Sequence, residues 1–239
     1  MRDPGEFYFE LPAERRPPAT PLAERWFPGA TGPEAPWRRC TSPRRDDPIS
    51  AVSVLVVHAT AGVSTSGAFS VMREGRASFH WLVPDEDEAA HGRHVWATAP
   101  ERRAAWHVRN SCRHKDINQG RPGINLVSLG VEIVNAQNAQ RSQSAATDAR
   151  AGGMDRFSLW QVAATAAIVR YAWAKYPNLR HVVSHARLDP ARRTDPGPHF
   201  PWERFRDLTL GGVDHPQESG RDWRGASACL AGRSNGDAV

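Results

Sequence analysis

The sequence predicts a mixed α/β fold, in which a central β-sheet is covered by helices. Residues 51–58 read AVSVLVVH, a continuous β-branched and aliphatic run that is typical of a strand buried on both faces. Residues 158–176 carry apolar side chains at helical spacing, and short apolar runs lie on both sides of this segment. Strands interspersed with helices, some of the strands fully apolar, are typical of such a layered domain.

The remaining elements follow from the same periodicities. We expect strands at residues 78–83 and 104–108, a weaker strand at 94–98, and another at 128–135, which reads SLGVEIVN. The long helix has two candidate caps, Asp155 and Ser158, and Pro177 ends it. A short last strand is predicted at 181–185 and a final short helix at 200–210.

Composition divides the chain into three parts. Residues 1–48 contain ten of the 19 prolines, which fix φ and remove backbone donors, so this part is expected to be an irregular or extended arm that packs on the domain. Residues 49–210 form the predicted domain. Residues 211–239 are rich in Gly, Asp, Ser and Arg and are predicted to be a flexible tail, and residues 136–153 a polar surface insertion.

Charge and composition exclude several classes of protein. The formal charge is +5 and the sequence pI about 9.6, but the arginines are scattered among acids, so no nucleic-acid partner is expected. No stretch approaches the roughly 18 apolar residues of a transmembrane helix. Three distant cysteines argue against a disulfide framework or a cysteine-based zinc ribbon. Because the N-terminus lacks a signal peptide, a cytoplasmic location is expected, with release to the cell wall as the alternative.

Two of the ten histidines stand at the ends of predicted buried strands. His58 ends the first strand and His185 the last, and Asp195 follows on a loop stiffened by Pro196 and Pro198. Two imidazoles and a carboxylate can supply the three protein ligands of a catalytic zinc ion. The alternative is that the histidines are satisfied locally and Asp195 makes a turn. The spacing alone does not decide between these readings.

Five segments that occur in one order carry a family resemblance. They are HATAG at 58–62, SFHWLV at 78–83, AWHV at 105–108, SLGVEIVN at 128–135 and SHARLDPARRTDPGPHFPW at 184–202. Together they resemble the zinc-dependent N-acetylmuramoyl-L-alanine amidases of the peptidoglycan-recognition and AmpD-like family (amidase type 2). The resemblance covers roughly residues 50–210, and it implies the peptidoglycan-recognition/amidase fold.

The resemblance also implies roles for individual residues. His58, His185 and Asp195 would bind Zn²⁺, and Glu132 would be the acid/base residue, unless it is a strand carboxylate paired with an arginine. Arg193 stands where the family often has a lysine that stabilises the oxyanion. An arginine can stabilise that charge, but it does not readily give up a proton.

Three further residues are candidates for substrate binding. The family segment that matches Trp106 and His107 lines the substrate groove, and an aromatic ring there can stack on a sugar or a peptide, although a core tryptophan is an almost equal alternative. Asn125 can donate to the stem peptide or anchor its own loop. His80 lies within an apolar strand, so we interpret it as a core residue or as support for a ligand imidazole rather than as a fourth ligand.

The expected function is therefore zinc-dependent hydrolysis of the amide between N-acetylmuramic acid and L-alanine, in peptidoglycan or in muropeptides. A peptidoglycan-binding recognition module without catalysis is the first alternative, and a zinc amidase acting on a related wall-like substrate is the second. The sequence does not separate an enzyme that recycles soluble anhydro-muropeptides from one that lyses intact wall, and it leaves the oligomeric state open.

Overall fold

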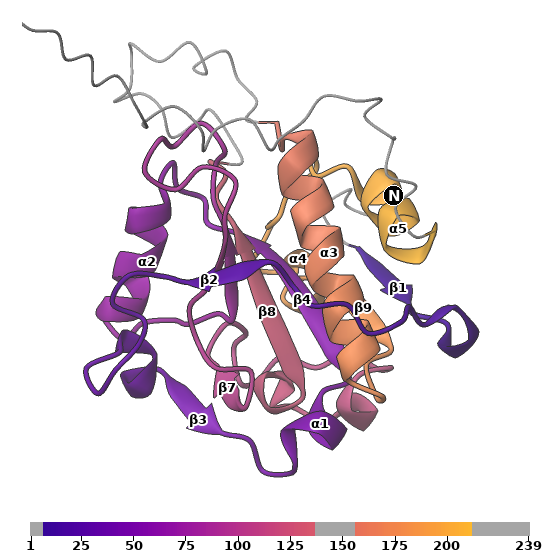
Figure 1. The fold of residues 1–239 in the computed structure, drawn as a ribbon. Coiled ribbons are helices and arrows are strands. Elements are labelled where there is room, and N and C mark those ends of the chain that lie inside the picture. Colours follow the sequence, from indigo (N-terminus) through magenta and orange to yellow (C-terminus); the bar gives the residue numbers. More distant parts are fainter. Residues whose placement is uncertain (1–6, 137–155, 212–239) are drawn as a thin grey trace, which may run out of the picture.

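The computed structural model describes residues 7–136 and 156–211 of the 239-residue chain. The described residues form a central sheet with the strand order β1-β9-β4-β8-β5-β6-β2 (Figure 1). The bounds are β1 (Tyr8–Glu10), β2 (Glu24–Trp26), β4 (Val54–Ala59), β5 (Trp81–Val83), β6 (Val95–Ala97), β8 (Ser128–Ile133) and β9 (His181–Ser184). Strands β9, β4, β8 and β5 are parallel neighbours, whereas β1 and β6 join antiparallel. The predicted mixed α/β fold is confirmed.

Helices and a small second sheet complete the architecture. The second sheet pairs β3 (Thr41–Pro43) with β7 (Arg103–Ala105). The α-helices are α1 (Pro48–Ala51), α2 (Thr65–Arg73), α3 (Leu159–Lys175), α4 (His185–Leu188) and α5 (Trp202–Gly211). The 3₁₀ helices are η1 (Ala13–Arg15), η2 (Pro36–Arg39), η3 (Asn118–Gly120) and η4 (Ile124–Leu126). None of the helices in the described segments combines the length and the apolar character needed to cross a membrane.

Helix α3 lies in front of the sheet in Figure 1 and covers one of its faces. Ser158, one of the two predicted caps, forms a capping box with Gln161 that satisfies backbone donors at the helix start. Fully buried side chains of α3, such as Trp173, pack against Leu129 and Val131 of β8 and their neighbours on β4. Burying this apolar face is the main stabilisation of the layer.

The opposite face of the sheet is covered by α2, α4 and the connection between β7 and β8. Side chains alternate along a strand, so Leu129 and Val131 of β8 enter the α3 core. The side chains of Ser128 and Glu132 point to this second face, where Gly130 between them has no side chain. The register pairs Glu132 with His58 of β4. The second face therefore carries Glu132 and His58 side by side, at the end of a face that is otherwise apolar at Val54 and Val56.

The proline-rich arm is part of the same structure over its described residues. Strand β1 pairs with β9, β2 with β6, and β3 with β7. Behind β3, the buried Arg44 guanidinium donates to the backbone carbonyls of Glu101, Leu126 and Ser128. Burial lowers the pKa of Arg44 to about 10, and the carbonyl partners compensate for the lost water. The arm thus fixes the start of β8.

Some elements differ from the sequence expectations. Helix α2 was not predicted, because its nine residues include two serines, a glycine and only a short apolar stripe of Ala68, Phe69 and Met72. The strands predicted at 51–58 and 78–83 are shorter, since β4 begins at Val54 and β5 at Trp81. The predicted tail, apart from Gly211, and nearly all of the predicted insertion at 136–153 lie outside the described residues.

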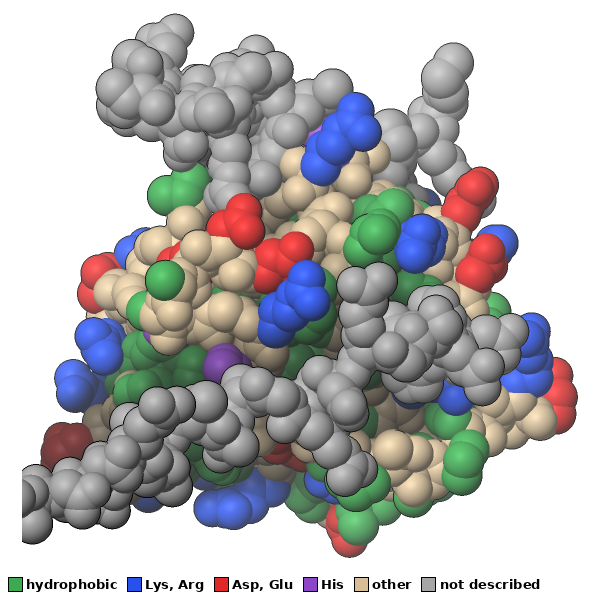
Figure 2. Space-filling view, turned by 45° about the horizontal axis from the view of Figure 1, so that its top comes forward, with side chains coloured by type: hydrophobic (Ala, Val, Ile, Leu, Met, Phe, Trp, Pro, Cys, Tyr) green, Lys and Arg blue, Asp and Glu red, His purple; other side chains and the backbone are tan. Residues whose placement is uncertain are grey.

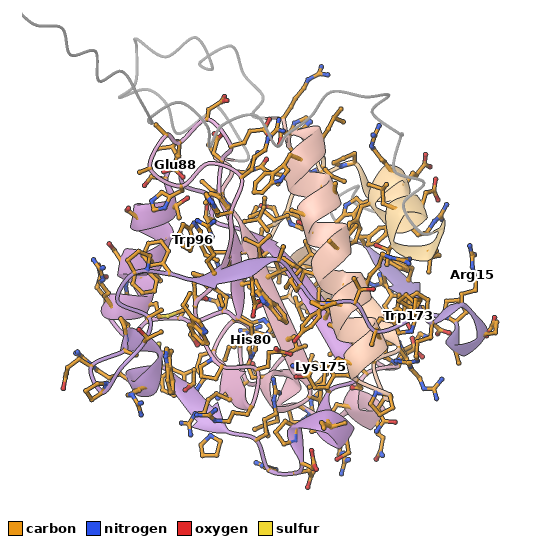
Figure 3. All side chains as sticks on the ribbon, viewed as in Figure 1. Arg15, His80, Glu88, Trp96, Trp173 and Lys175 are labelled. Carbon is orange, nitrogen blue, oxygen red and sulfur yellow. The ribbon has the colours of Figure 1, made fainter. Side chains whose placement is uncertain are left out.

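His80 lies in the interior between the two sheets (Figure 3). Its Nδ1 accepts a hydrogen bond from the Gly130 N–H, so its proton is on Nε2, which lies 3.0 Å from the carbonyl oxygen of Arg103. Burial, assisted by the charge of Arg44, lowers the pKa of His80 to about 3. The ring is therefore held neutral.

This shift makes the stability of the protein depend on pH. An unfolded histidine has a pKa near 6.5, so below that pH the unfolded chain takes up a proton that folded His80 refuses. We expect the free energy of unfolding to decrease as the pH is lowered. Below about pH 6, His80 should contribute about 1.4 kcal/mol of this decrease per pH unit. Denaturant titrations of wild type and His80→Asn between pH 7 and 5, with chelator present, measure this difference in slope. If the free energy of unfolding depends on pH equally steeply in both proteins, this expectation is contradicted.

Candidate active site

Three potential ligand atoms converge at one end of the parallel strands. Nδ1 of His58 lies 3.0 Å from Nδ1 of His185, and Oδ2 of Asp195 lies 3.3 Å from the first atom and 3.1 Å from the second. All three side chains are buried. The structure thus brings together the three residues that the sequence suggested as metal ligands.

The segment after β9 places two of these groups. His185 is the first residue of α4, which the Ser184 hydroxyl caps by accepting from the N–H of Arg187. The chain then turns back, and the carbonyl of Asp195 accepts a 2.9 Å hydrogen bond from the N–H of Ala186. This backbone contact holds Asp195 beside His185.

Electrostatics keep this cluster ready to bind a cation. Burial raises the pKa of the Asp195 carboxyl, but hydrogen bonds with His185 and His58 outweigh it and hold that pKa below its usual range. Burial, together with the neighbouring His185, lowers the pKa of His58 to about 4. The carboxylate is thus ionised and the His58 ring neutral at pH 7, which are the forms that ligate metals.

Glu132 lies beside the cluster, opposite His58 in the strand register. Its Oε2 is buried and has no hydrogen-bond partner among the described residues. Burial, and then the charge of Asp195, raise the pKa of Glu132 well above its usual range, while Arg193 opposes the shift. A buried carboxyl whose pKa is raised is a candidate for proton transfer.

The cluster opens into a cavity of about 630 Å³, whose lining includes Glu132, Arg193 and Thr60 as well as the three potential ligands. Arg193 stands two residues before Asp195, and its backbone N–H donates to the Asp189 carbonyl. The structure therefore brings the predicted oxyanion residue to the same cavity as the predicted acid/base residue.

The predicted substrate-binding residues line an adjoining cavity of about 290 Å³. Trp106 is 40% exposed, and its Nε1 donates to the Ser42 hydroxyl of the arm. His107 and Asn125 line the same wall but are almost fully buried, at 7% and 5% exposure. Burial, then the neighbouring His58, lower the pKa of His107 well below its usual value. Contact of these three residues with substrate stays a prediction.

Sequence reasoning missed the arginines of this second cavity. Arg76, Arg109 and Arg192 line it together with Arg193, and Arg109 donates to the buried Asp189 carboxylate at 2.9 Å. They come from three separate segments, so the sequence shows no cluster of basic residues that would have predicted this arrangement. On the face shown in Figure 2, basic and acidic side chains are interspersed, and only small areas of histidine are visible.

The fold and the cluster define an α/β protein with a candidate metal site at the ends of its parallel strands. Residues 48–198 match the family model of N-acetylmuramoyl-L-alanine amidases, Amidase_2. The chain belongs to this family.

Curated relatives agree with the family match. The chain is 30% identical over 165 residues to the N-acetylmuramoyl-L-alanine amidase AmiD of Escherichia coli, a match covering 67% of this chain and 54% of that protein. It is 30% identical over 141 residues to the 1,6-anhydro-N-acetylmuramyl-L-alanine amidase AmpD of Salmonella typhimurium, covering 59% and 61%. The matched region thus spans little more than half the length of these relatives.

Solved structures of the family share the fold. Escherichia coli AmiD in complex with the substrate anhydro-N-acetylmuramic acid-L-Ala-D-gamma-Glu-L-Lys superposes with a TM-score of 0.52 at 26% identity, over 67% of this chain and 58% of that one. AmpDh3 from Pseudomonas aeruginosa gives 0.55 at 25% identity, over 67% and 61%.

The converging ligand atoms lead to a direct test. We expect His58→Ala, His185→Ala and Asp195→Ala each to abolish stoichiometric binding of Zn²⁺, because each variant removes one of the three ligand atoms. His94→Ala, a histidine whose ring bonds the carbonyl of His91, is the matched control and should bind like wild type. Elemental analysis after dialysis against zinc measures the content. Full zinc content in any of the three ligand variants would contradict the assignment.

Proposed function

We propose that this chain is a zinc-dependent amidase that hydrolyses the bond between N-acetylmuramic acid and L-alanine in peptidoglycan or its muropeptides, with residues 49–210 as the catalytic domain. The observation that carries the proposal is the cluster of His58, His185 and Asp195 beside Glu132, whose buried Oε2 has no hydrogen-bond partner among the described residues, in a chain of the amidase family. A recognition module that only binds muropeptides has no need of this pairing.

The spacing of the three ligand atoms fits a zinc ion. A tetrahedral ion with bonds of about 2.1 Å separates its ligand atoms by about 3.4 Å. The distances among His58, His185 and Asp195 are 3.0 to 3.3 Å. Two imidazoles and one carboxylate also form the donor set of a catalytic rather than a structural zinc site, because three protein ligands leave one position open.

The residues around the cluster suit amide hydrolysis. A zinc ion held by His58, His185 and Asp195 would polarise the amide carbonyl and lower the pKa of an attacking water towards about 7. Glu132 is placed to take the proton of the attacking water on Oε2 and to return it to the nitrogen of L-alanine as the amide C–N bond breaks. Its raised pKa suits both halves of this transfer, since it holds the proton between the two steps.

Arg193 acts on the charge that develops at the carbonyl oxygen. Arg193 lines the cavity that holds Glu132 and the three ligands. A permanently protonated group stabilises an oxyanion by electrostatics and hydrogen bonding but does not donate its proton. Proton transfer is therefore assigned to Glu132 rather than to Arg193.

The adjoining cavity suits the stem peptide. The γ-linked glutamate of the substrate in the AmiD complex leaves an α-carboxylate free. Arg76, Arg109 and Arg192 line this cavity and can pair with carboxylates, and the half-exposed Trp106 offers a face for stacking. His107 and Asn125 complete the wall.

The proposal is tested by product analysis. Purified protein is incubated with intact sacculi and with soluble muropeptides, with and without chelator, and the products are identified by mass spectrometry. We expect release of free stem peptide that chelator abolishes and zinc restores. Tight muropeptide binding without product would instead establish the recognition module, and the two substrates separate lytic from recycling activity.

Glu132→Gln keeps the shape of the side chain but removes its basicity. We expect kcat to fall by about 10²- to 10⁴-fold while zinc content and substrate affinity stay near wild type, because the side chain acts on the proton and not on the metal. Steady-state kinetics with muropeptide, together with zinc analysis, measure both. Full turnover in a zinc-loaded variant would remove Glu132 from the mechanism.

Arg193 has a matched pair of variants. Arg193→Ala removes the cation, so kcat should fall by about 10²- to 10³-fold, whereas Arg193→Lys restores a positive charge and should recover most of the rate. Kinetics on one muropeptide compare the two. If both variants lose activity equally, the charge of Arg193 is not what the reaction uses.

A further inference from the structure

We propose that His107 is a positioning residue that fixes the tautomer and ring orientation of His58 through a buried hydrogen-bond relay ending at Ser128. Nε2 of His58 lies 2.9 Å from Nδ1 of His107, and Nε2 of His107 lies 3.0 Å from the Ser128 hydroxyl. All three residues are buried. The inference rests on the metal site of the proposed function, but not on amide hydrolysis.

The direction of the relay follows from the ligand atom. If Nδ1 of His58 offers its lone pair to a metal, the ring proton of neutral His58 is on Nε2 and is donated to His107. Nδ1 of His107 is then an acceptor, so the His107 proton is on Nε2 and is donated to Ser128. With Nδ1 of His58 on the metal, each remaining ring nitrogen has one role, and only one arrangement of protons satisfies both rings.

The fold makes room for the His107 ring at a glycine. Ser128, Gly130 and Glu132 belong to the same face of β8. In the strand register they pair with Val54, Val56 and His58 of β4, respectively. A Cβ at Gly130 would lie 2.8 to 3.0 Å from three atoms of the His107 imidazole, closer than side chains approach in proteins. The ring therefore lies directly over Gly130 and bridges from Ser128 on β8 to His58 on the neighbouring strand.

The backbone on both sides of His107 is held by side chains. The N–H of Trp106 donates to the Ser78 hydroxyl, and the carbonyl of Trp106 accepts from the N–H of Ser78. Asn125 brackets Val108 in the same way, accepting from its N–H at 3.0 Å and donating to its carbonyl at 2.7 Å. Such two-sided fixation suits a ring that must be placed accurately rather than one that adapts to a ligand.

A partner that orients a metal-bound imidazole typically changes metal affinity 10- to 100-fold when it is lost. His107→Leu removes the acceptor, so zinc affinity should fall by about this factor. His107→Asn carries an oxygen close to the former position of Nδ1, and we expect it to recover affinity to within about fivefold of wild type. Ser128→Ala leaves the His107 ring in place but removes the acceptor that selects its tautomer, and a loss of about threefold to tenfold is expected.

The experiment uses the full chain and reads two quantities. Zinc affinity is measured by competition with a chromophoric chelator, and long-range ¹H–¹⁵N correlation spectra of the zinc-loaded protein report the protonated nitrogen of each histidine. Thr165→Val is the control for Ser128→Ala, because it loses a buried 2.8 Å hydroxyl bond within α3, away from the site. We expect protons on Nε2 of both His58 and His107, and wild-type zinc affinity in Thr165→Val.

Three results would overturn the proposal: a proton on Nδ1 of His107, equal zinc affinity in the Leu and Asn variants, or no change in Ser128→Ala relative to Thr165→Val. If His107→Leu does not fold, Ser128→Ala and the wild-type spectra still decide the question. Failure of the amidase proposal gives a different pattern, in which zinc binds with these affinity differences but no stem peptide is released.

Discussion

The register between β4 and β8 is the constraint on which the site depends. It places His58 beside Glu132, and it puts Gly130, which has no side chain, under the His107 ring. A shift of one residue would send Glu132 into the α3 core and bring Val131 to the metal-binding face. The apolar alternation of Leu129, Val131 and Ile133, buried against α3, fixes this register. The core that stabilises one face of the sheet thereby sets the chemistry of the other.

The proline-rich arm and the connection between β7 and β8 build the rest of the site from outside the parallel strands. Arg44 holds the first residue of β8 through the Ser128 carbonyl, and Ser42 orients Trp106 at the rim. The site is thus supported from the arm, from β8 and from the segment after β9. The buried donors and acceptors at these junctions pair with one another, which gives the wall of the cavity a defined shape.

Much of the fold and part of the site followed from sequence, for physical reasons that particular residues illustrate. A continuous apolar run reveals β4, which is buried on both faces, and apolar side chains at strand or helical spacing reveal β8 and α3. Strand ends and a proline-stiffened loop made His58, His185 and Asp195 candidates, but the spacing left a local structural role open, and only the family resemblance pointed to a metal site. The relay through His107 was not found, since it depends on which residue of β8 lies opposite which residue of β4. The arginines of the second cavity were not predicted because they come from separate segments. Helix α2 was not predicted because its apolar stripe is too short.

The central claim is that His58, His185 and Asp195 hold a zinc ion with one position left open for chemistry. X-ray absorption spectroscopy of the zinc-loaded protein tests this most directly. The expected spectrum has four nitrogen or oxygen neighbours at about 2.0–2.1 Å, with the scattering signature of two imidazoles. A spectrum with sulfur neighbours, with three or more imidazoles, or with six-coordinate zinc and no imidazole would contradict the account.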